Sequence, residues 1–146
     1  MISLIITGHG HFASGLFSAV EQVIGPQEQC IAVDFPPEMS TQQLDEKLTQ
    51  ALASLPQQDG VLFFTDLLGG SPFRSSVLLS QTLEHSDVVA GTNMQMLAEM
   101  LMERDAISST ETFVTQALAC GQQGMLSFKQ KQQETTPSLS SDEDGI

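Results

Sequence analysis

The sequence predicts an α/β fold: a doubly wound, mainly parallel sheet with helices on both faces. Short apolar runs alternate with amphipathic helical stretches along the chain, an order typical of parallel sheets. The run at residues 61–66 is apolar without alternation, as expected of a strand buried on both faces. It ends at Asp66, and a glycine pair then leads to Ser71-Pro72, where serine can cap a helix that proline begins.

The composition is that of one globular domain. The chain has 146 residues, 40% of them hydrophobic, which is enough to bury a core. No apolar run approaches the roughly 20 residues that span a bilayer, and residues 1–6 resemble a strand more than a signal peptide. Two cysteines without an export signal favour reduced thiols and the cytoplasm. A formal charge of −13 argues against nucleic-acid binding, which needs clustered lysines and arginines.

The first half of the chain predicts two strands, each followed by a helix. Residues 2–8 form the first strand, and a helix from about His11 to Ile24 follows and stops at Gly25-Pro26. Residues 30–35 form the second strand. Ser40–Gln43 is a capping box that begins the second helix, which Pro56 ends. The buried stripe of this helix is Leu44, Leu48, Ala51, Leu52 and Leu55.

The second half predicts the third strand at 61–66, a fourth at 87–91 and a short last strand at 125–128. The helix that begins at Ser71-Pro72 is expected to bury Phe73, Val77, Leu78 and Leu83. Asn93 can cap a helix that runs to about Arg104, and a capping box at 108–111 begins another that ends at Gly121. We therefore expect one domain at 1–129 and a polar, disordered tail at 130–146.

Right-handed crossovers and a strand order of 2-1-3-4 bring His9 and Asp66 together. The order reverses between strands 1 and 3, and open α/β sheets bind ligands at such a switch point. His9 follows strand 1 and Asp66 ends strand 3, so the two side chains are expected to face each other. On the pattern alone, two solvated turn residues are an equally good interpretation.

As a pair, His9 and Asp66 predict a transient phosphohistidine site. An aspartate that accepts a hydrogen bond from one ring nitrogen fixes the tautomer and leaves the other nitrogen free to attack. Backbone N–H groups near two helix N-termini favour a phosphoryl group, and a serine hydroxyl adds a donor. The residues predicted to bind the phosphoryl group are Gly10, Leu67, Gly69, Gly70 and Ser71.

Other readings of these motifs have less support. His11 is expected to flank the site or cap the helix, and His85 to lie on the surface. No cluster of His, Cys and Asp has metal-ligand spacing, so no metal site is predicted. The glycine pair fits no P-loop, and a Ser71-His9-Asp66 hydrolase lacks the strand–turn–helix elbow that exposes a nucleophilic serine.

Three motifs give the chain a specific resemblance. Ile5–Leu16, Val61–Phe73 and Val89–Met94 resemble the enzyme IIA component of the mannose-family sugar phosphotransferase system. The match covers most of residues 1–128 and is most similar to stand-alone N-acetylgalactosamine/galactosamine IIA proteins. The mannose member carries a IIB domain after a linker, whereas this chain stops after its tail, so a separate IIB polypeptide is expected.

The resemblance implies a phosphotransferase in which His9 accepts a phosphoryl group from HPr on Nε2 and passes it to IIB, while Asp66 holds Nδ1. It implies no cofactor, because the N–P bond stores the transfer potential. It also implies a homodimer that exchanges the antiparallel edge strand at 125–128, which would cover an exposed edge. The IIC/IID permease complex would place the cytoplasmic protein at the inner face of the membrane.

Three alternatives stay open, and the transported sugar is not predicted. A IIA-like subunit that feeds a dihydroxyacetone kinase would share the fold and the His9 chemistry. A receiver-like domain would use Asp66 as phosphoacceptor, although Gly8-His9 replaces the acidic pair that such domains need for Mg²⁺. A non-catalytic binding or scaffold protein with the same fold would carry no covalent phosphate.

Overall fold

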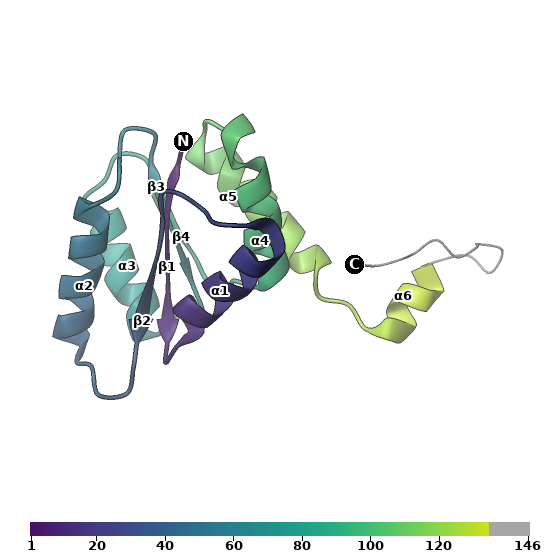
Figure 1. Ribbon diagram of the computed structural model, residues 1–146, viewed down its shortest axis with the longest axis horizontal. Helices are drawn as coiled ribbons and strands as arrows, with labels where there is room; N and C mark the ends of the chain where they lie inside the picture. The colour runs from purple at the N-terminus through teal and green to yellow at the C-terminus, as the bar shows by residue number, and fades with distance from the viewer. Residues whose placement is uncertain (135–146) are drawn as a thin grey trace.

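The computed structural model describes residues 1–134 and confirms the predicted α/β fold. Its four strands form a parallel sheet in the order β2-β1-β3-β4, with helices on both faces (Figure 1). The strands are β1 (Ser3–His9), β2 (Cys30–Phe35), β3 (Val61–Thr65) and β4 (Ser86–Val89). The helices are α1 (Phe12–Ile24), α2 (Thr41–Ala53), α3 (Ser71–Ser80), α4 (Met94–Glu103), the 3₁₀ turn η1 (Arg104–Ala106), α5 (Thr110–Gln123) and α6 (Phe128–Glu134).

The core lies on both faces of the sheet because successive side chains of each strand point to opposite sides. Leu4 and Ile6 of β1 belong to the layer beneath α1, α4 and α5, whereas Ile5 belongs to the layer beneath α2 and α3 (Figure 1). All three are fully buried. A strand buried on both faces needs no polar alternation, which explains the unbroken apolar runs in the sequence.

Side-chain caps fix the starts of α2, α4 and α5. The predicted capping box of α2 is present: Ser40 Oγ accepts the Gln43 N–H, and Gln43 Oε1 accepts the Ser40 N–H. Asn93 caps α4 as predicted. The box predicted at 108–111 is wrong by one residue, because Ser109 accepts from the Thr112 N–H at 3.2 Å. The predicted capping role of Ser71 is also wrong, since Gly70 is the N-cap and Ser71 is the first helical residue of α3.

Helix α3 buries a different face from the one predicted. Its buried residues are Pro72, Ser75 and Ser76, whereas Leu78 is 65% exposed. Small serine side chains face the protein interior, Leu79 packs against the core, and Phe73 and Val77 are only partly buried. The expectation that Leu78 is a core residue was therefore wrong. Leu83, which follows the helix, does pack against the core.

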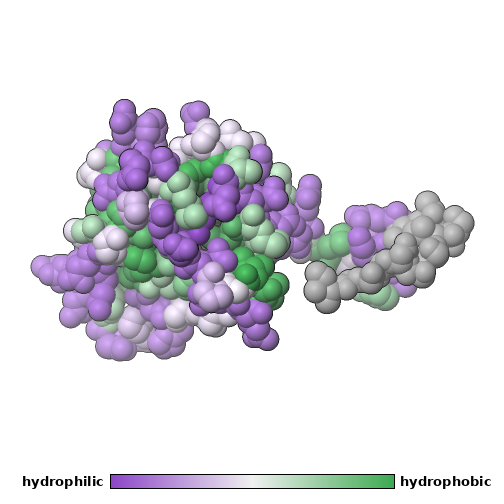
Figure 2. Space-filling model, turned by 45° about the horizontal axis from the view of Figure 1, so that its top comes forward, coloured by the Kyte–Doolittle hydropathy of each residue, from purple (hydrophilic) through white to green (hydrophobic). Residues whose placement is uncertain are grey.

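The C-terminal segment differs most from prediction. Residues 125–127 have no regular structure, and Phe128 begins helix α6 where a strand was expected. The cause is local: Ser127 and Gln130 form a capping box, with Ser127 Oγ accepting the Gln130 N–H at 3.0 Å. Residues 125–134, called the arm below, extend away from the domain formed by the sheet and helices α1 to α5 (Figures 1 and 2). Residues 130–134 of the predicted disordered tail are helical, and 135–146 lie outside the described residues.

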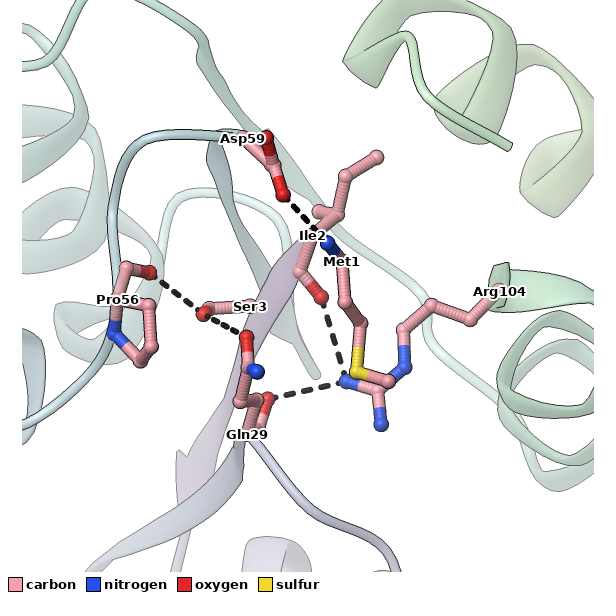
Figure 3. Close-up of polar contacts among 7 residues, drawn as sticks. All are labelled: Met1, Ile2, Ser3, Gln29, Pro56, Asp59 and Arg104. Carbon is pink, nitrogen blue, oxygen red and sulfur yellow. Dashed lines mark hydrogen bonds and ion pairs between the residues drawn. The ribbon is translucent and has the colours of Figure 1, made fainter. Parts of the chain in front are cut away.

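Arg104 joins the starts of β1 and β2 to the end of α4. Its guanidinium is buried, and Nη1 donates to the carbonyl oxygens of Ile2 and Gln29 at 3.3 and 3.1 Å (Figure 3). Nη2 donates to the carbonyl of Glu28 at 2.6 Å. Buried carbonyls left without donors cost free energy, so Arg104 stabilises the edge of the sheet opposite His9.

Among residues 1–134, no helix combines the length and the apolar character that crossing a membrane requires.

Candidate active site

His9 and Asp66 meet at the carboxyl edge of the two central strands. Asp66 Oδ2 accepts hydrogen bonds from the backbone N–H of His9 at 2.8 Å and from His9 Nδ1 at 2.9 Å. One oxygen therefore holds both the backbone and the ring of the histidine. With Nδ1 as the donor, the neutral ring has its lone pair on Nε2, which is the arrangement of an oriented nucleophile.

The carboxylate of Asp66 is held as an acceptor. Its second oxygen, Oδ1, accepts the N–H of Leu67 at 2.6 Å. Partial burial raises the pKa of Asp66, but the hydrogen bonds from His9 and Leu67 outweigh burial and bring the pKa below its usual value. The side chain of Asp66 is 17% exposed, compared with 47% for His9, so the ring faces solvent while its partner is covered.

Two glycines make room for this pair. A Cβ at Gly8 would lie 2.9 Å from Asp66 Cγ and 2.5 Å from a ring carbon of Phe12. A Cβ at Gly70 would lie 2.7 Å from Cε1 and 3.4 Å from Nε2 of His9. The distances of 2.5, 2.7 and 2.9 Å are shorter than real Cβ contacts allow, so these two positions must lack a side chain for the carboxylate and the ring to lie where they do.

Phe35 supports the other side of the histidine. Its ring meets the His9 ring edge-on, with 5.9 Å between centroids and 62° between planes. The backbone groups of Gly10 and Phe35 also exchange hydrogen bonds, at 2.8 Å from the Gly10 N–H and 3.2 Å from the Phe35 N–H. The end of β2 therefore contributes both to the ring's packing and to the shape of the turn that carries it.

The five residues predicted to bind the phosphoryl group differ in whether their hydrogen-bond donors are free. The N–H groups of Gly10, Leu67 and Gly70 are already used, by the carbonyl of Phe35, the carboxylate of Asp66 and the carbonyl of Leu67. Within residues 1–134, the N–H groups of Gly69 and Ser71 and the hydroxyl of Ser71 have no hydrogen-bond partner. Gly69 and Ser71 therefore keep donors at the N-terminus of α3, where the helix dipole favours an anion.

An apolar rim lies beside these donors. Leu67 and Leu68 are 62% and 73% exposed. Arg74 is also exposed, and its Nε donates to the carbonyl of Gly69 at 2.8 Å, which ties α3 to the glycine loop. Large apolar side chains exposed together around a reactive group are typical of a surface that meets another protein.

Reasoning from sequence missed Gly8, Phe35 and Asp34 as site residues. Gly8 and Phe35 adjoin predicted features, and their importance follows from contacts that only the folded chain shows. Asp34, at the end of β2, accepts from His11 Nδ1 at 3.2 Å, so His11 flanks the site as expected. His11 is the N-cap of α1 but makes no side-chain capping bond.

The described residues contain no group of three or more His, Cys, Asp or Glu side chains that could hold a metal ion. A hollow of about 510 Å³ lies at the opposite edge of the sheet, bordered by Asp59, His85 and Ser109. His85 is exposed there, as predicted. The candidate active site is therefore the His9–Asp66 pair, in which a carboxylate orients the ring of a histidine.

The chain is similar to known proteins over most of its length. The family model described as "PTS system fructose IIA component" matches residues 3–117. The mannose-specific EIIAB component of Escherichia coli K12 is 38% identical over 130 residues, which is 89% of this chain and 40% of that relative. The fructose-specific EIIA component of Bacillus subtilis is 35% identical over 108 residues, 74% of each chain. The crystal structure of EIIA from Streptococcus agalactiae superposes with a TM-score of 0.81 at 30% identity, covering 88% of this chain and 98% of that one.

Proposed function

The chain is a member of the mannose-family enzyme IIA components of the sugar phosphotransferase system, and we propose that His9 is its phosphoacceptor. In this proposal His9 takes a phosphoryl group from HPr and gives it to a separate IIB subunit that serves sugar uptake. The observation that carries the proposal is that Asp66 Oδ2 holds both the N–H and Nδ1 of His9 and leaves Nε2 as the free ring nitrogen.

The transfer step exchanges one N–P bond for another. The Nε2 lone pair of His9 attacks phosphorus in line, the bond from phosphorus to the donor histidine breaks, and that histidine keeps the electron pair. Positive charge builds on the His9 ring, and the ionised carboxylate of Asp66 stabilises it. The free donors of Gly69 and Ser71 are suited to the equatorial phosphoryl oxygens. Phosphoryl transfer between two histidines needs no cofactor in this scheme.

The exposed apolar rim of Leu67 and Leu68 is the surface on which we place HPr and IIB. Both partners must bring their own histidine to the same nitrogen, so they bind in turn. IIB then gives the phosphate to the sugar that the IIC/IID permease carries, which places the protein in the cytoplasm beside the membrane. The chain spans 40% of the length of its EIIAB relatives.

The arm after α5 supports a homodimer. Met125 and Phe128 are 73% and 75% exposed, and Leu126 is 44% exposed. A second copy that received the arm beside the outer edge of β4 would cover these side chains and that edge. A variant that ends at Gly124 is expected to be a monomer by light scattering. A dimer of unchanged affinity in this variant would rule out the arm.

Intact mass tests the central proposal. The protein is incubated with enzyme I, HPr and phosphoenolpyruvate, then treated with acid or alkali. One phosphate that is lost in acid, kept in alkali and absent from His9→Ala is expected. Phosphate that is also lost in alkali would indicate an acyl phosphate on Asp66 and contradict the proposal. No added mass, with HPr shown to be phosphorylated, would contradict it as well.

Onward transfer identifies the acceptor. Phosphorylated protein is mixed with a purified IIB subunit or with a dihydroxyacetone kinase, and loss of phosphate is followed by mass. Transfer to IIB is the expected result. Transfer to the kinase alone would keep His9 as the phosphoacceptor but overturn the proposed role in sugar uptake.

A further inference from the structure

A second carboxylate, that of Asp34, binds residues that follow His9 in the turn between β1 and α1. Asp34 is the second-last residue of the neighbouring strand β2, and its side chain is 23% exposed. Its Oδ1 accepts the backbone N–H of Ser14 at 2.9 Å, and its Oδ2 accepts the Ser14 hydroxyl at 2.6 Å and His11 Nδ1 at 3.2 Å. Partial burial raises the pKa of Asp34, but these hydrogen bonds outweigh burial and lower it, so the carboxylate is held ionised as an acceptor.

Asp34 supplies the cap that α1 lacks. The N-cap residue of α1 is His11, which makes no side-chain bond to the helix. The Ser14 N–H belongs to the first turn, where N–H groups have no partner within the helix. Asp34 satisfies this N–H from another strand, 20 residues away in sequence. The position at which α1 begins is therefore set by β2 and not by a local capping residue.

The two aspartates hold opposite ends of one short turn. Asp66 holds His9 by its N–H and ring, and Asp34 holds His11 and Ser14. Gly10 lies between them with a φ of +58°, a conformation that glycine adopts at little cost. Gly10 itself is held to the end of β2 by its two backbone hydrogen bonds with Phe35, so the position of the turn depends on β2 at Gly10 and, through Asp34, at the start of α1.

We propose that Asp34 is a positioning residue for His9: by anchoring the first turn of α1, it fixes the direction in which His9 presents Nε2. The inference rests on the proposed phosphoacceptor role of His9. A shift of about 1 Å in a reacting atom can reduce a rate by about 100-fold, so loss of the anchor is expected to slow transfer even though Asp34 touches neither the His9 ring nor phosphate.

The test compares Asp34→Asn with Asp45→Asn, which removes the same charge from an exposed site on α2. Phosphoryl transfer from HPr is measured for each, together with the ¹⁵N chemical shifts of the His9 ring nitrogens in the free protein. Asp34→Asn is expected to lower kcat between about 10-fold and 100-fold, with KM for HPr within about two-fold, and to move the His9 ring shifts. Asp45→Asn is expected to change none of these.

Two results would overturn the proposal. An unchanged kcat and unchanged His9 ring shifts, with a lower unfolding midpoint, would make Asp34 only a stabilising cap of α1. A raised KM with unchanged kcat would make the Asp34–His11 pair a docking contact for HPr. If wild-type protein takes no phosphate from HPr, the proposed function fails, and the ring shifts still decide whether Asp34 positions His9.

Ser14→Ala keeps the test decisive if Asp34→Asn does not fold. It removes the Ser14 hydroxyl bond at 2.6 Å and retains the N–H bond and the carboxylate. A smaller decrease in kcat and a smaller shift of the His9 ring signals, both in the same direction, are expected. No change in either measurement in a folded Ser14→Ala and a folded His11→Ala would contradict the positioning role.

Discussion

Gly70 lies against the ring of His9 so closely that a Cβ on Gly70 would meet Cε1 at 2.7 Å. The φ of Gly70 is −73° and its ψ is 171°, values that any L-residue adopts without strain. The glycine is therefore required by the neighbouring ring and not by its own backbone. A substitution of Gly70 is therefore expected to disturb the position of the His9 ring without straining the backbone.

Gly70→Ala is expected to displace the His9 ring and lower the rate of phosphoryl transfer by about 10-fold to 100-fold, with a small change in stability. Gly15→Ala is the matched control, because a Cβ at Gly15 would meet nothing within 4 Å. The control is expected to raise the free energy of unfolding by up to about 1 kcal/mol and to leave transfer unchanged. Equal transfer rates in both variants would show that the ring has room to move.

Asp66→Asn is expected to slow transfer by about 100-fold or more while the fold persists. An amide has one accepting oxygen, so it cannot serve both His9 and the N–H of Leu67 as the carboxylate does. The ring then loses its fixed tautomer. Rapid-quench transfer from HPr measures the rate, and circular dichroism checks the fold. A rate within about two-fold of wild type would refute the orienting role.

Acid is expected to destabilise the protein through Asp34 and Asp66. Both have a pKa that is lower in the folded protein than in the unfolded chain, where it is about 4. The unfolded state therefore binds protons first, and the stability that these groups contribute is complete above about pH 4 and is lost as pH falls through their folded pKa values. Urea unfolding between about pH 7 and pH 3 measures this loss.

The matched comparison for acid stability is the Asp34→Asn/Asp66→Asn double variant. It is expected to be less stable than wild type at neutral pH and to show a smaller decrease in unfolding free energy below about pH 4. The same decrease in both proteins would assign the acid sensitivity to other carboxylates.

Both thiols are expected to be unreactive in the folded protein. Burial raises the pKa of Cys30 to about 12 and that of Cys120 to about 11, so little thiolate forms near about pH 8. A chromogenic disulfide reagent is expected to label neither thiol before unfolding and both after it. Fast labelling of native protein would show that one of the thiols is reached by local opening.

The parts of the fold that local sequence determines were predictable. Ser40 and Gln43 lie three residues apart and cap α2 without help from the rest of the chain, and the apolar run at 61–65 is a strand under any arrangement that buries it on both faces. The His9–Asp66 pair was predictable because parallel strands end at one edge of a sheet. These features need only spacing and topology.

The parts that were missed depend on contacts between distant segments. The cap of α1 comes from Asp34 on another strand, so no local pattern marks it. Helix α3 presents Ser75 and Ser76 inward, which reverses the usual reading of apolar residues as core. The box at Ser127 and Gln130 is a local signal that the apolar character of Met125-Leu126 obscured.

Arg104 bears on how the chain can fold during its synthesis. The carbonyls that it binds belong to residues up to 102 positions earlier in sequence, at the starts of the first two strands. A ribosome makes those strands first, and until Arg104 has been added their carbonyls lack its donors, although the carbonyl of Gln29 also accepts the N–H of Leu4. A nascent chain that ends before Arg104 therefore lacks the side chain that binds this edge of the sheet. We therefore expect products truncated before Arg104 to have a less stable sheet edge and to be degraded faster than products that include it.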